Sequence, residues 1–250
     1  MSVSVIVIAS GGPKKETSIT NKFDSKETLG ACVESLAKQT VCPREVIVVD
    51  GSRDGSATSK LFIGGLDMWK VVPDPSGIQS HSRNIGVGLS NGSVVAFLDS
   101  DCVAPPGWIG AVEENAKKGI EAMGGPYIPF QQTDFAQTTY RLMGWSTSRL
   151  TMQFARREDQ RKVGVDSVTG GNSAFARDLF LRARGYNEKQ DCREESDFCR
   201  RVRERDVEIL FDPEMWVYHR WRGWDGLKEF AQTSYFYGRI RVRSPRQAKA

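Results

Sequence analysis

One stretch decides the fold predicted for this chain: Val94-Val95-Ala96-Phe97-Leu98-Asp99-Ser100-Asp101. In it, an apolar run leads directly into two carboxylates. A short apolar run with β-branched and aromatic residues is typical of a buried strand. Ligands of open α/β sheets bind outside the carboxyl ends of the strands, which is where Asp99 and Asp101 stand. Carboxylate oxygens are also the ligands that Mg²⁺ and Mn²⁺ prefer. A turn with two solvated acids explains the same residues, so the pair indicates a metal site only together with other features.

Similar apolar runs recur along the chain and alternate with helix-like stretches. This alternation predicts an α/β fold, with a mostly parallel twisted sheet and helices on both faces. Two polar stretches without an apolar period, residues 10–25 and 155–162, are predicted loops. The predicted strands are residues 3–9, 45–50, 69–72, 93–99 and 122–128, with a further strand region at 165–176, and the predicted helices are residues 27–38, 78–90 and 106–118.

Length and composition describe an ordinary globular protein. With 250 residues, 39% of them hydrophobic, the chain can bury a sizeable core in one domain or two tightly fused lobes. Its five cysteines are an odd set without a Cys-x-x-Cys pair, so neither a disulfide framework nor a zinc site is expected. The N-terminal apolar run lacks a preceding basic region, and no stretch approaches the roughly 18 apolar residues of a membrane span. A cytoplasmic protein, soluble or peripheral to a membrane, is therefore expected.

Positive charge is concentrated at the end of the chain. Residues 220–250 hold eight basic and two acidic residues, which leaves residues 1–219 slightly acidic within the overall net charge of +4. Nucleic acid is therefore not an expected partner. Basic and aromatic residues alternate in this tail, a pattern that suits an anionic membrane surface or a lipid-phosphate acceptor. The pattern suits equally a solvated helix whose aromatic side chains pack on the domain.

A second predicted strand, residues 45–50, also ends in carboxylates. Asp50 closes this strand, and Asp54 follows within a segment that contains Gly51 and Gly55. Asp and Gly are common turn residues, so a simple turn explains this segment when it is taken alone.

Taken together, the two strand ends resemble glycosyltransferase family 2, the inverting sugar-transferring enzymes of GT-A fold. The resemblance covers roughly residues 3–220, and the order and spacing of the motifs agree with the family. The matching motifs are Gly51-Ser52-Arg53-Asp54-Gly55-Ser56, Ser82-Arg83-Asn84-Ile85-Gly86, Phe97-Leu98-Asp99-Ser100-Asp101, Pro106-Gly107-Trp108, Gly170-Gly171-Asn172-Ser173-Ala174-Phe175, Gly185-Tyr186-Asn187-Glu188 and Glu194-Glu195.

The resemblance implies which residues bind the nucleotide-sugar donor. Asp50 or Asp54 would lie near the base and ribose, and Asp99 near the ribose or the water of the metal. Arg83 would face the diphosphate or hold the aspartates, although an Arg inside a helix often makes only a surface salt bridge. The first strand ends in Ala9 without the family's Pro-x-Tyr-Asn, and one Asp precedes Gly51 where many members have two, so base contacts are not carried over by side chain. The implied donor-binding residues are Ala9, Asp50, Asp54, Arg83 and Asp99.

The resemblance also implies a divalent metal, Mn²⁺ or Mg²⁺, with Asp101 as its direct ligand. Such a cation stabilises the charge that develops on a departing diphosphate. A late histidine completes the metal site in part of the family, and His219 stands at that place. An imidazole ligand would favour Mn²⁺ over Mg²⁺. A purely structural role for His219 is the equal alternative.

Glu195 matches the catalytic base of the family, which takes the proton of the acceptor hydroxyl. Acids in the first turn of a helix are also favoured by the helix dipole alone. We prefer the catalytic interpretation because Phe198 and Val202 could face the core and fix the direction of Glu195. The family has Asp here, and the extra methylene of Glu moves the carboxylate. The residues placed on the acceptor side are Gly171, Asn172 and Glu194.

The predicted molecule is one GT-A-like catalytic domain at residues 1–219, followed by a basic-aromatic tail or helix at 220–250. Residues 1–103 would bind the donor, and residues 104–219, with a small antiparallel portion, would serve the acceptor and the base. The expected reaction is inverting hexosyl transfer from a UDP or GDP sugar to a glycan or lipid-linked acceptor, at a hydroxyl or a lipid phosphate. The cytoplasmic face of a membrane would suit the second acceptor. The alternatives are a sugar-phosphate nucleotidyltransferase, faintly indicated by residues 10–15, and a catalytically inactive binding module.

Overall fold

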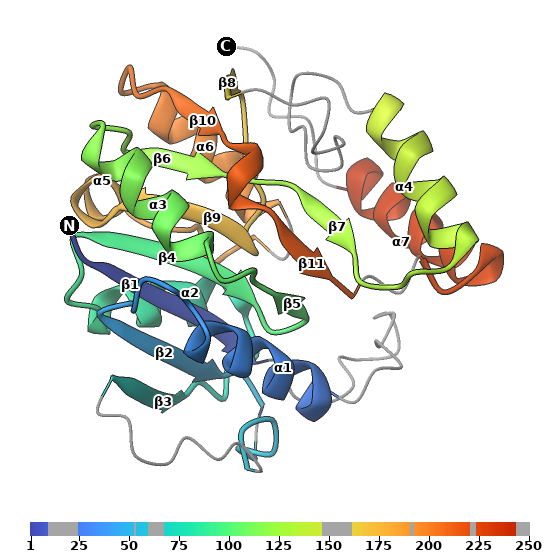
Figure 1. Cartoon of the computed structure of the whole chain (residues 1–250), viewed down its shortest axis with the longest axis horizontal. Coiled ribbons are helices and arrows are strands. Elements are labelled where there is room, and N and C mark those ends of the chain that lie inside the picture. Colours follow the sequence, from blue (N-terminus) through green and yellow to red (C-terminus); the bar gives the residue numbers. More distant parts are fainter. Residues whose placement is uncertain are drawn as a thin grey trace.

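The computed structural model describes residues 1–9, 25–52, 54–59, 68–146, 162–190, 193–220 and 224–243 (Figure 1). Three predictions fall wholly or mainly outside these residues: the loop at 10–25, the polar stretch at 155–162 and the last residues of the tail. Within the described chain, eight strands form one sheet in the order β3-β2-β1-β4-β9-β6-β10-β8. The predicted α/β class is confirmed.

Four neighbouring parallel strands form one half of the large sheet. They are β3 (Trp69–Pro73), β2 (Glu45–Asp50), β1 (Val3–Ala9) and β4 (Val94–Asp99). Alternate side chains of one strand enter two separate apolar layers: Val94, Ala96 and Leu98 lie in one layer, and Val95 and Phe97 in the other. Burial on both faces is the reason these strands read as nearly continuous apolar runs.

Helices cover both faces of the sheet. α1 (Ser25–Ala37) and α3 (Trp108–Lys117) contribute to the first apolar layer, while α2 (Gln79–Leu89), α5 (Arg177–Arg182) and α6 (Glu194–Arg203) contribute to the second. The three helices predicted in the first half are confirmed to within two residues at each end. Each is held by apolar side chains that face the sheet.

The other half of the large sheet mixes directions. β9 (Asn172–Ala176) is antiparallel to both β4 and β6 (Ala122–Gly124), and β10 (Ile209–Phe211) is parallel to β6 but antiparallel to β8 (Val163–Val165). A 3₁₀ turn at Pro213–Met215 follows β10. A separate three-stranded sheet has the order β5-β11-β7, formed by β5 (Cys102–Val103), β11 (Val217–His219) and β7 (Tyr127–Pro129).

The prediction of one strand over residues 122–128 is wrong, because the chain divides this run between β6 in the large sheet and β7 in the small one. The break falls at Gly125 and Pro126. A Cβ at Gly125 would lie 2.2 Å from the Met215 carbonyl oxygen, so only glycine permits this approach. Pro126 has no N–H to donate to a continuing ladder.

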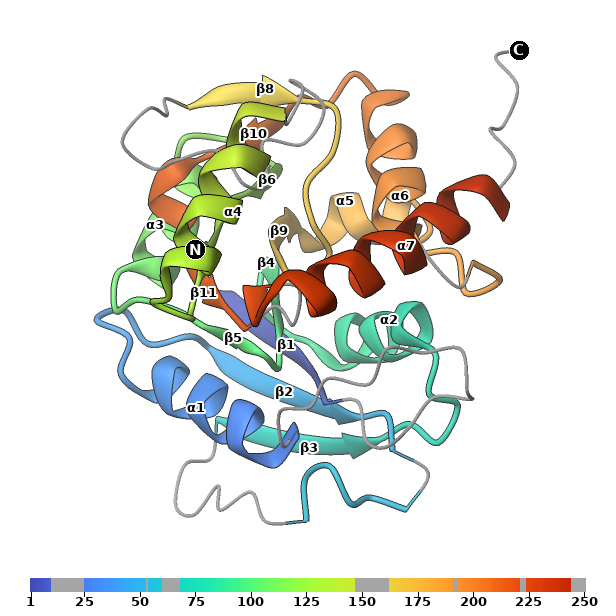
Figure 2. The ribbon, with the colours of Figure 1, turned by 90° about the vertical axis from the view of Figure 1, so that its right-hand side faces the viewer.

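The last two long helices pack against each other at one end of the molecule (Figures 1 and 2). α4 (Asp134–Ser146) and α7 (Leu227–Arg243) meet through Phe135 and Phe230, whose rings are 6.4 Å apart between centroids.

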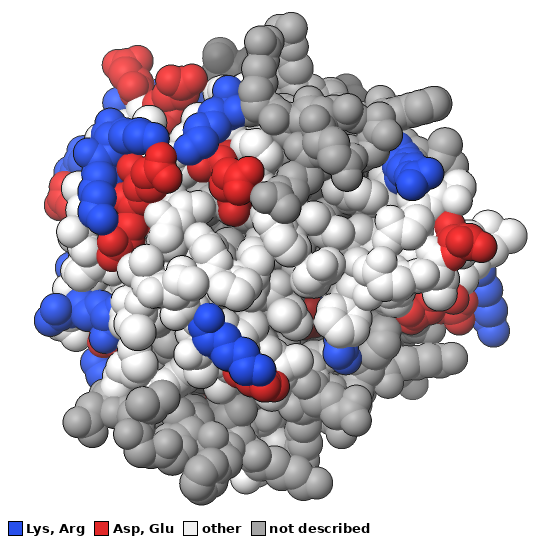
Figure 3. All heavy atoms as spheres, in the orientation of Figure 1, with Lys and Arg blue, Asp and Glu red and all other residues white. Residues whose placement is uncertain are grey.

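No helix among the described residues is long and apolar enough to cross a membrane. In the face that Figure 3 draws, basic side chains are interspersed with acidic ones and do not form a single positive patch.

Candidate active site

The carboxyl ends of the central strands meet at one edge of the sheet. β1 lies between β2 and β4, and the parallel register places Ala9 beside Asp50 and Ile8 beside Asp99. The amide of Gly51 donates a hydrogen bond of 2.8 Å to the carbonyl oxygen of Ala9, which joins the two strand ends. The structure therefore brings three predicted donor-side residues, Ala9, Asp50 and Asp99, to the same edge.

Asp50 organises the turn that follows β2. One carboxylate oxygen accepts hydrogen bonds from the Ser52 amide, at 2.9 Å, and from the Ser52 hydroxyl. The other accepts from the Thr58 amide at 3.0 Å and the Thr58 hydroxyl at 2.6 Å. Asp50 is 1% exposed, whereas Asp54 lies on the exposed surface of the same turn and accepts from the Ser56 amide at 3.0 Å.

Asp74, which the sequence analysis did not select, lies just after β3. Its amide donates to the Asp50 carbonyl oxygen at 2.7 Å, and its carboxylate accepts from the Ser82 hydroxyl at 2.6 Å and contacts His81 Nδ1 at 3.1 Å. Burial alone would raise the pKa of Asp74, but hydrogen bonds led by that of Ser82 outweigh it and lower the pKa. An Asp directly after a third strand was the signal available in the sequence.

Arg83 lies at the centre of the site and links the two halves of the molecule. Its guanidinium donates to Asp99 Oδ1 at 3.0 Å and to Glu194 Oε1 at 2.6 Å, and the residue is 3% exposed. Of the two placements predicted for Arg83, this geometry agrees with the one in which it holds an aspartate. Burial raises the pKa of Asp99, the Arg83 charge opposes that rise, and the pKa stays above its usual value.

Glu194 and Glu195 open helix α6, whose direction is fixed by the fully buried side chains of Phe198 and Val202. The expectation that these two apolar residues face the core is confirmed. Glu194 is buried and pairs with Arg83, as described above. Burial, and then the charge of Glu194, raise the pKa of Glu195 to about 7. A carboxyl group with this pKa can accept a proton near neutral pH.

Three potential metal ligands converge next to Asp99. A carboxylate oxygen of Asp101, a ring nitrogen of His219 and the Cys102 sulfur lie within 4.8 Å of one another. His219 Nε2 is 3.5 Å from Asp101 Oδ2. Burial lowers the pKa of His219, but the Asp101 carboxylate outweighs this effect and the pKa is raised. Because carboxylate and imidazole are ligands of divalent transition metals, the residues fit a cation such as Mn²⁺.

Two aromatic residues that the sequence analysis did not select hold the ring of His219. Tyr127 stacks on it with centroids 4.3 Å apart and an interplanar angle of 26°. Trp224, which is fully buried, meets it edge to face at 6.1 Å. Trp224 lies in the segment predicted as a tail, so this part of the tail packs against the candidate metal ligand. The strand and tail patterns gave no signal of these contacts.

Gly171 lies where only a hydrogen atom fits. A Cβ there would be 1.9 Å from Asp99 Oδ2 and 2.6 Å from the Tyr127 hydroxyl. The Gly171 carbonyl oxygen also accepts a hydrogen bond of 3.1 Å from the Asp99 amide. This residue therefore sets the position of Asp99.

Asn172 is fully buried beneath the site, and both ends of its amide are engaged. Its oxygen accepts from Trp108 Nε1 at 2.9 Å, and its nitrogen donates to the carbonyl oxygens of Pro126 and Met215 at 3.2 and 2.7 Å. The side chain of Asn172 therefore braces three segments and is not exposed to an acceptor.

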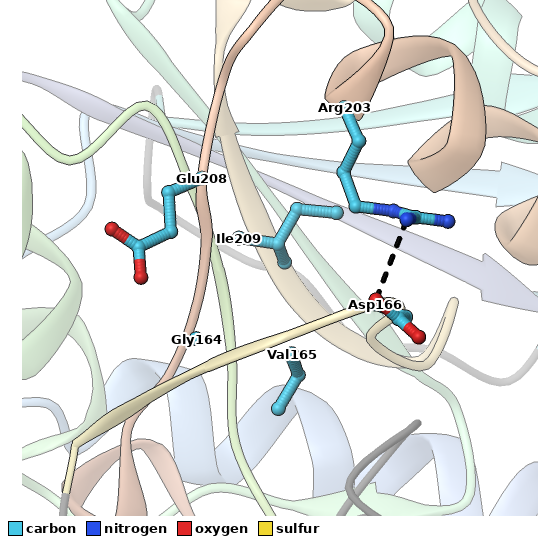
Figure 4. A pocket seen from close by; sticks show the side chains of 6 residues that line it. All are labelled: Gly164, Val165, Asp166, Arg203, Glu208 and Ile209. Carbon is cyan, nitrogen blue, oxygen red and sulfur yellow. Dashed lines mark ion pairs between the residues drawn. The ribbon is translucent and has the colours of Figure 1, made fainter.

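A pocket of about 340 Å³ lies elsewhere, against the paired strands β8 and β10 and the last residue of α6 (Figure 4). Two of its three charged residues, Asp166 and Arg203, form an ion pair at 3.3 Å. None of the predicted site residues lines it. The lining residues are Gly164, Val165, Asp166, Arg203, Glu208 and Ile209.

Comparisons with known proteins show the family to which the chain belongs. A model of the family described as Glycosyl transferase family 2 matches residues 19–182. A glucosyl-dolichyl phosphate glucuronosyltransferase of Haloferax volcanii is 28% identical, over 80% of this chain and 67% of that protein. A glycosyltransferase of the same organism, AglE, is 30% identical over 41% of this chain and 36% of its own length.

Solved glycosyltransferases share the fold at low sequence identity. A mannosyltransferase from Pyrobaculum calidifontis, in complex with GDP-Man and Mn²⁺, aligns with a TM-score of 0.61 and 16% identity, over 99% of this chain and 65% of its own. GalNAc-T7 with UDP, GalNAc and Mn²⁺ aligns with a TM-score of 0.60 and 17% identity, over 99% of this chain and 52% of its own. The chain thus spans between about half and two thirds of these structures, and its fold is the GT-A fold.

Proposed function

We propose that this chain, which belongs to glycosyltransferase family 2 and is therefore a glycosyltransferase, transfers a hexosyl group from a UDP or GDP sugar with inversion at the anomeric carbon. The observation that carries the proposal is the bridge of Arg83 between Asp99 and Glu194. This bridge joins the carboxyl end of β4, next to the proposed metal ligands, to the start of α6, which carries Glu195, and a direct displacement would need both around one point.

The donor is proposed to lie across the carboxyl ends of β1, β2 and β4. Ala9, the turn organised by Asp50 and the exposed Asp54 would contact the nucleoside, and Asp99 would lie near the ribose. The compared structures contain UDP or GDP-Man, which supports these two nucleotides as the first to test.

Asp101 and His219 are proposed to hold the divalent metal. When bound there, the cation would supply positive charge to the oxygens of the departing diphosphate. Tyr127 and Trp224 fix the ring of His219, and Gly171 fixes the carboxylate of Asp99. These supports reduce the reorganisation needed when donor and metal arrive.

Glu195 is proposed as the base that takes the proton of an acceptor hydroxyl as its oxygen attacks the anomeric carbon. Its pKa of about 7 keeps a large fraction ionised at neutral pH while it remains basic enough to accept the proton. Glu194 would position the start of α6 through Arg83 and not touch the acceptor itself. Asn172 would likewise act as a support.

A lipid-linked acceptor is proposed from the Haloferax volcanii relative, whose name includes glucosyl-dolichyl phosphate. Helix α7 exposes Leu227 and Tyr235, 73% and 68% accessible, and the exposed Lys228 follows Leu227 in a tail whose sequence is rich in basic residues. Apolar and basic side chains together suit the headgroup region of an anionic membrane, such as the cytoplasmic face of a cell membrane. Cosedimentation with anionic liposomes at low salt tests this contact, and absence of the protein from the liposome pellet would contradict it.

The nucleotidyltransferase alternative rested on residues 10–15, which lie outside the described residues, and the family match favours sugar transfer. The inactive-module alternative is tested by activity. Donor hydrolysis and sugar transfer that were unchanged in both Asp101→Ala and Glu195→Gln would contradict the proposed mechanism.

A thermal-shift screen of UDP, GDP, CDP and dTDP sugars, with and without Mn²⁺, tests the donor site. A donor present at a hundred times its Kd stabilises the fold by about 2.7 kcal/mol. For a chain of this length, that raises the Tm by about 5–11 °C. The Mn²⁺-dependent part of the shift should disappear in Asp101→Asn and persist in Asp178→Asn, a matched change at an exposed acid on α5. Failure of every donor to shift the Tm would refute the donor site.

A further inference from the structure

The cluster next to Asp99 contains a thiol, that of Cys102, for which the proposed reaction has no use. Cys102 and His219 are directly opposite each other in the antiparallel pairing of β5 with β11, so their side chains lie on the same face. The Cys102 residue is fully buried, and its sulfur lies within 4.8 Å of the ligand atoms of Asp101 and His219. The thiol therefore forms part of the floor of the metal site.

The three ligand types differ in the cations that they prefer. Carboxylate oxygen suits Mg²⁺ and Mn²⁺, imidazole suits Mn²⁺ and Zn²⁺, and a thiolate selects soft cations such as Zn²⁺. Zn²⁺ is bound in proteins by Cys, His and Asp or Glu side chains, and in catalytic sites three protein ligands leave one position for water or substrate. For a given set of nitrogen, oxygen and sulfur ligands, affinity for Zn²⁺ also exceeds affinity for Mn²⁺.

From this arrangement we infer that Asp101, Cys102 and His219 form a three-ligand site for a thiophilic divalent cation, and that this cation is Zn²⁺. The inference rests on the proposed function in so far as Asp101 and His219 are also the ligands of the working metal. Zn²⁺ bound through Cys102 excludes Mn²⁺ and inhibits transfer. As the sulfur–zinc bond forms, the thiol proton leaves to solvent, and neither the metal nor the sulfur changes oxidation state.

The surroundings hold the ligands close to where such a cation needs them. The Arg220 amide donates to the Asp101 carbonyl oxygen at 3.0 Å and ties the backbone of Asp101 to the end of β11. Stacking on Tyr127 restrains the His219 ring. His219 Nδ1 is buried without a hydrogen-bond partner among the described residues, so its orientation is set by packing and by Asp101.

Co²⁺ is the probe that tests for the sulfur ligand, because a thiolate bound to Co²⁺ gives a charge-transfer absorption in the near ultraviolet that oxygen and nitrogen ligands do not give. The full chain is titrated with Co²⁺ in the absence of donor, and then with Zn²⁺. The band should appear in the parent chain and in Cys42→Ser, which removes an exposed thiol. It should vanish in Cys102→Ser, and Zn²⁺ should bleach it in the parent chain.

A second measurement follows Mn²⁺ by electron paramagnetic resonance. Zn²⁺ should release bound Mn²⁺ from the parent chain, and the Zn²⁺ concentration needed should rise at least about tenfold in Cys102→Ser. Binding of Mn²⁺ by Cys102→Ser shows that this variant is folded; if it is not, Cys102→Ala replaces it. A band that persists without the Cys102 thiol would overturn the inference. Co²⁺ that binds the parent chain without the band would overturn it too and leave the proposed function intact, whereas a parent chain that binds neither Mn²⁺ nor Co²⁺ would refute both.

Discussion

Replacing Arg83 by Met should destabilise the fold strongly, because the change leaves two carboxylates at the site without their shared cation. The ion pair of Arg83 with Glu194 is the more buried one, with side-chain exposures of 4% and 8%, whereas the side chain of Asp99 is 33% exposed. Breaking a buried pair by removing one partner costs about 3–5 kcal/mol. Since solvent screens the Asp99 pair, we expect the lower end, about 3 kcal/mol.

Urea unfolding followed by far-ultraviolet circular dichroism measures this cost. A loss of about 3 kcal/mol corresponds to a fall in Tm of about 6–12 °C for a chain of this length. Arg182→Met is the matched control, because Arg182 is half-exposed and pairs with Glu121 and Asp178 at the surface. Its cost should stay below about 1 kcal/mol.

The double variant Arg83→Met, Glu194→Gln separates the charge effect from lost packing. Neutralising Glu194 removes the buried charge that the single change leaves unpaired, so the double variant should recover part of the lost stability, with a coupling energy of about 1–3 kcal/mol. The reasoning is refuted if Arg83→Met costs no more than Arg182→Met, or if Glu194→Gln adds its own full cost to that of the first change.

Three further outcomes follow from the site. The value of kcat/KM should rise with pH and level off above about 7, because only the ionised form of Glu195 accepts a proton. Burial and the adjacent glutamate raise the pKa of Glu195 to about 7. A pH–rate profile with its midpoint near the ordinary carboxyl pKa of 4.5 would contradict this prediction. Gly171→Ala should abolish the donor-dependent and Mn²⁺-dependent thermal shifts, because the new Cβ would lie 1.9 Å from Asp99 Oδ2. The control Gly30→Ala in α1 should leave both shifts unchanged, because a Cβ at Gly30 has no neighbouring atom within 4 Å. Asn172→Ala should cost about 2–4 kcal/mol in urea unfolding because it leaves buried polar groups unpaired, and a cost below about 1 kcal/mol would show that the brace is not needed.

The sequence by itself determined the strands of the parallel half of the large sheet and the edge at which their acidic residues stand. A strand buried on both faces requires an unbroken apolar run, so β1, β2 and β4 could be located from local composition. A strand also has a direction, which placed Asp50 and Asp99 at its carboxyl end without knowledge of any neighbour. Local pattern failed at residues 122–128, because an apolar run does not reveal that Gly125 must let the chain turn into a second sheet.

Only the tertiary structure decided which side chains meet at that edge. Arg83 and Glu194 are separated by 111 positions and come together because β9 inserts between β4 and β6 and carries α6 onto the same face as α2. Cys102 joins His219 only through the pairing of β5 with β11, and spacing among cysteines gave no hint of it. Local periodicity specifies which face of a helix or strand is buried. Strand order and register specify which side chains of other elements that face contacts, and both depend on the packing of the whole chain.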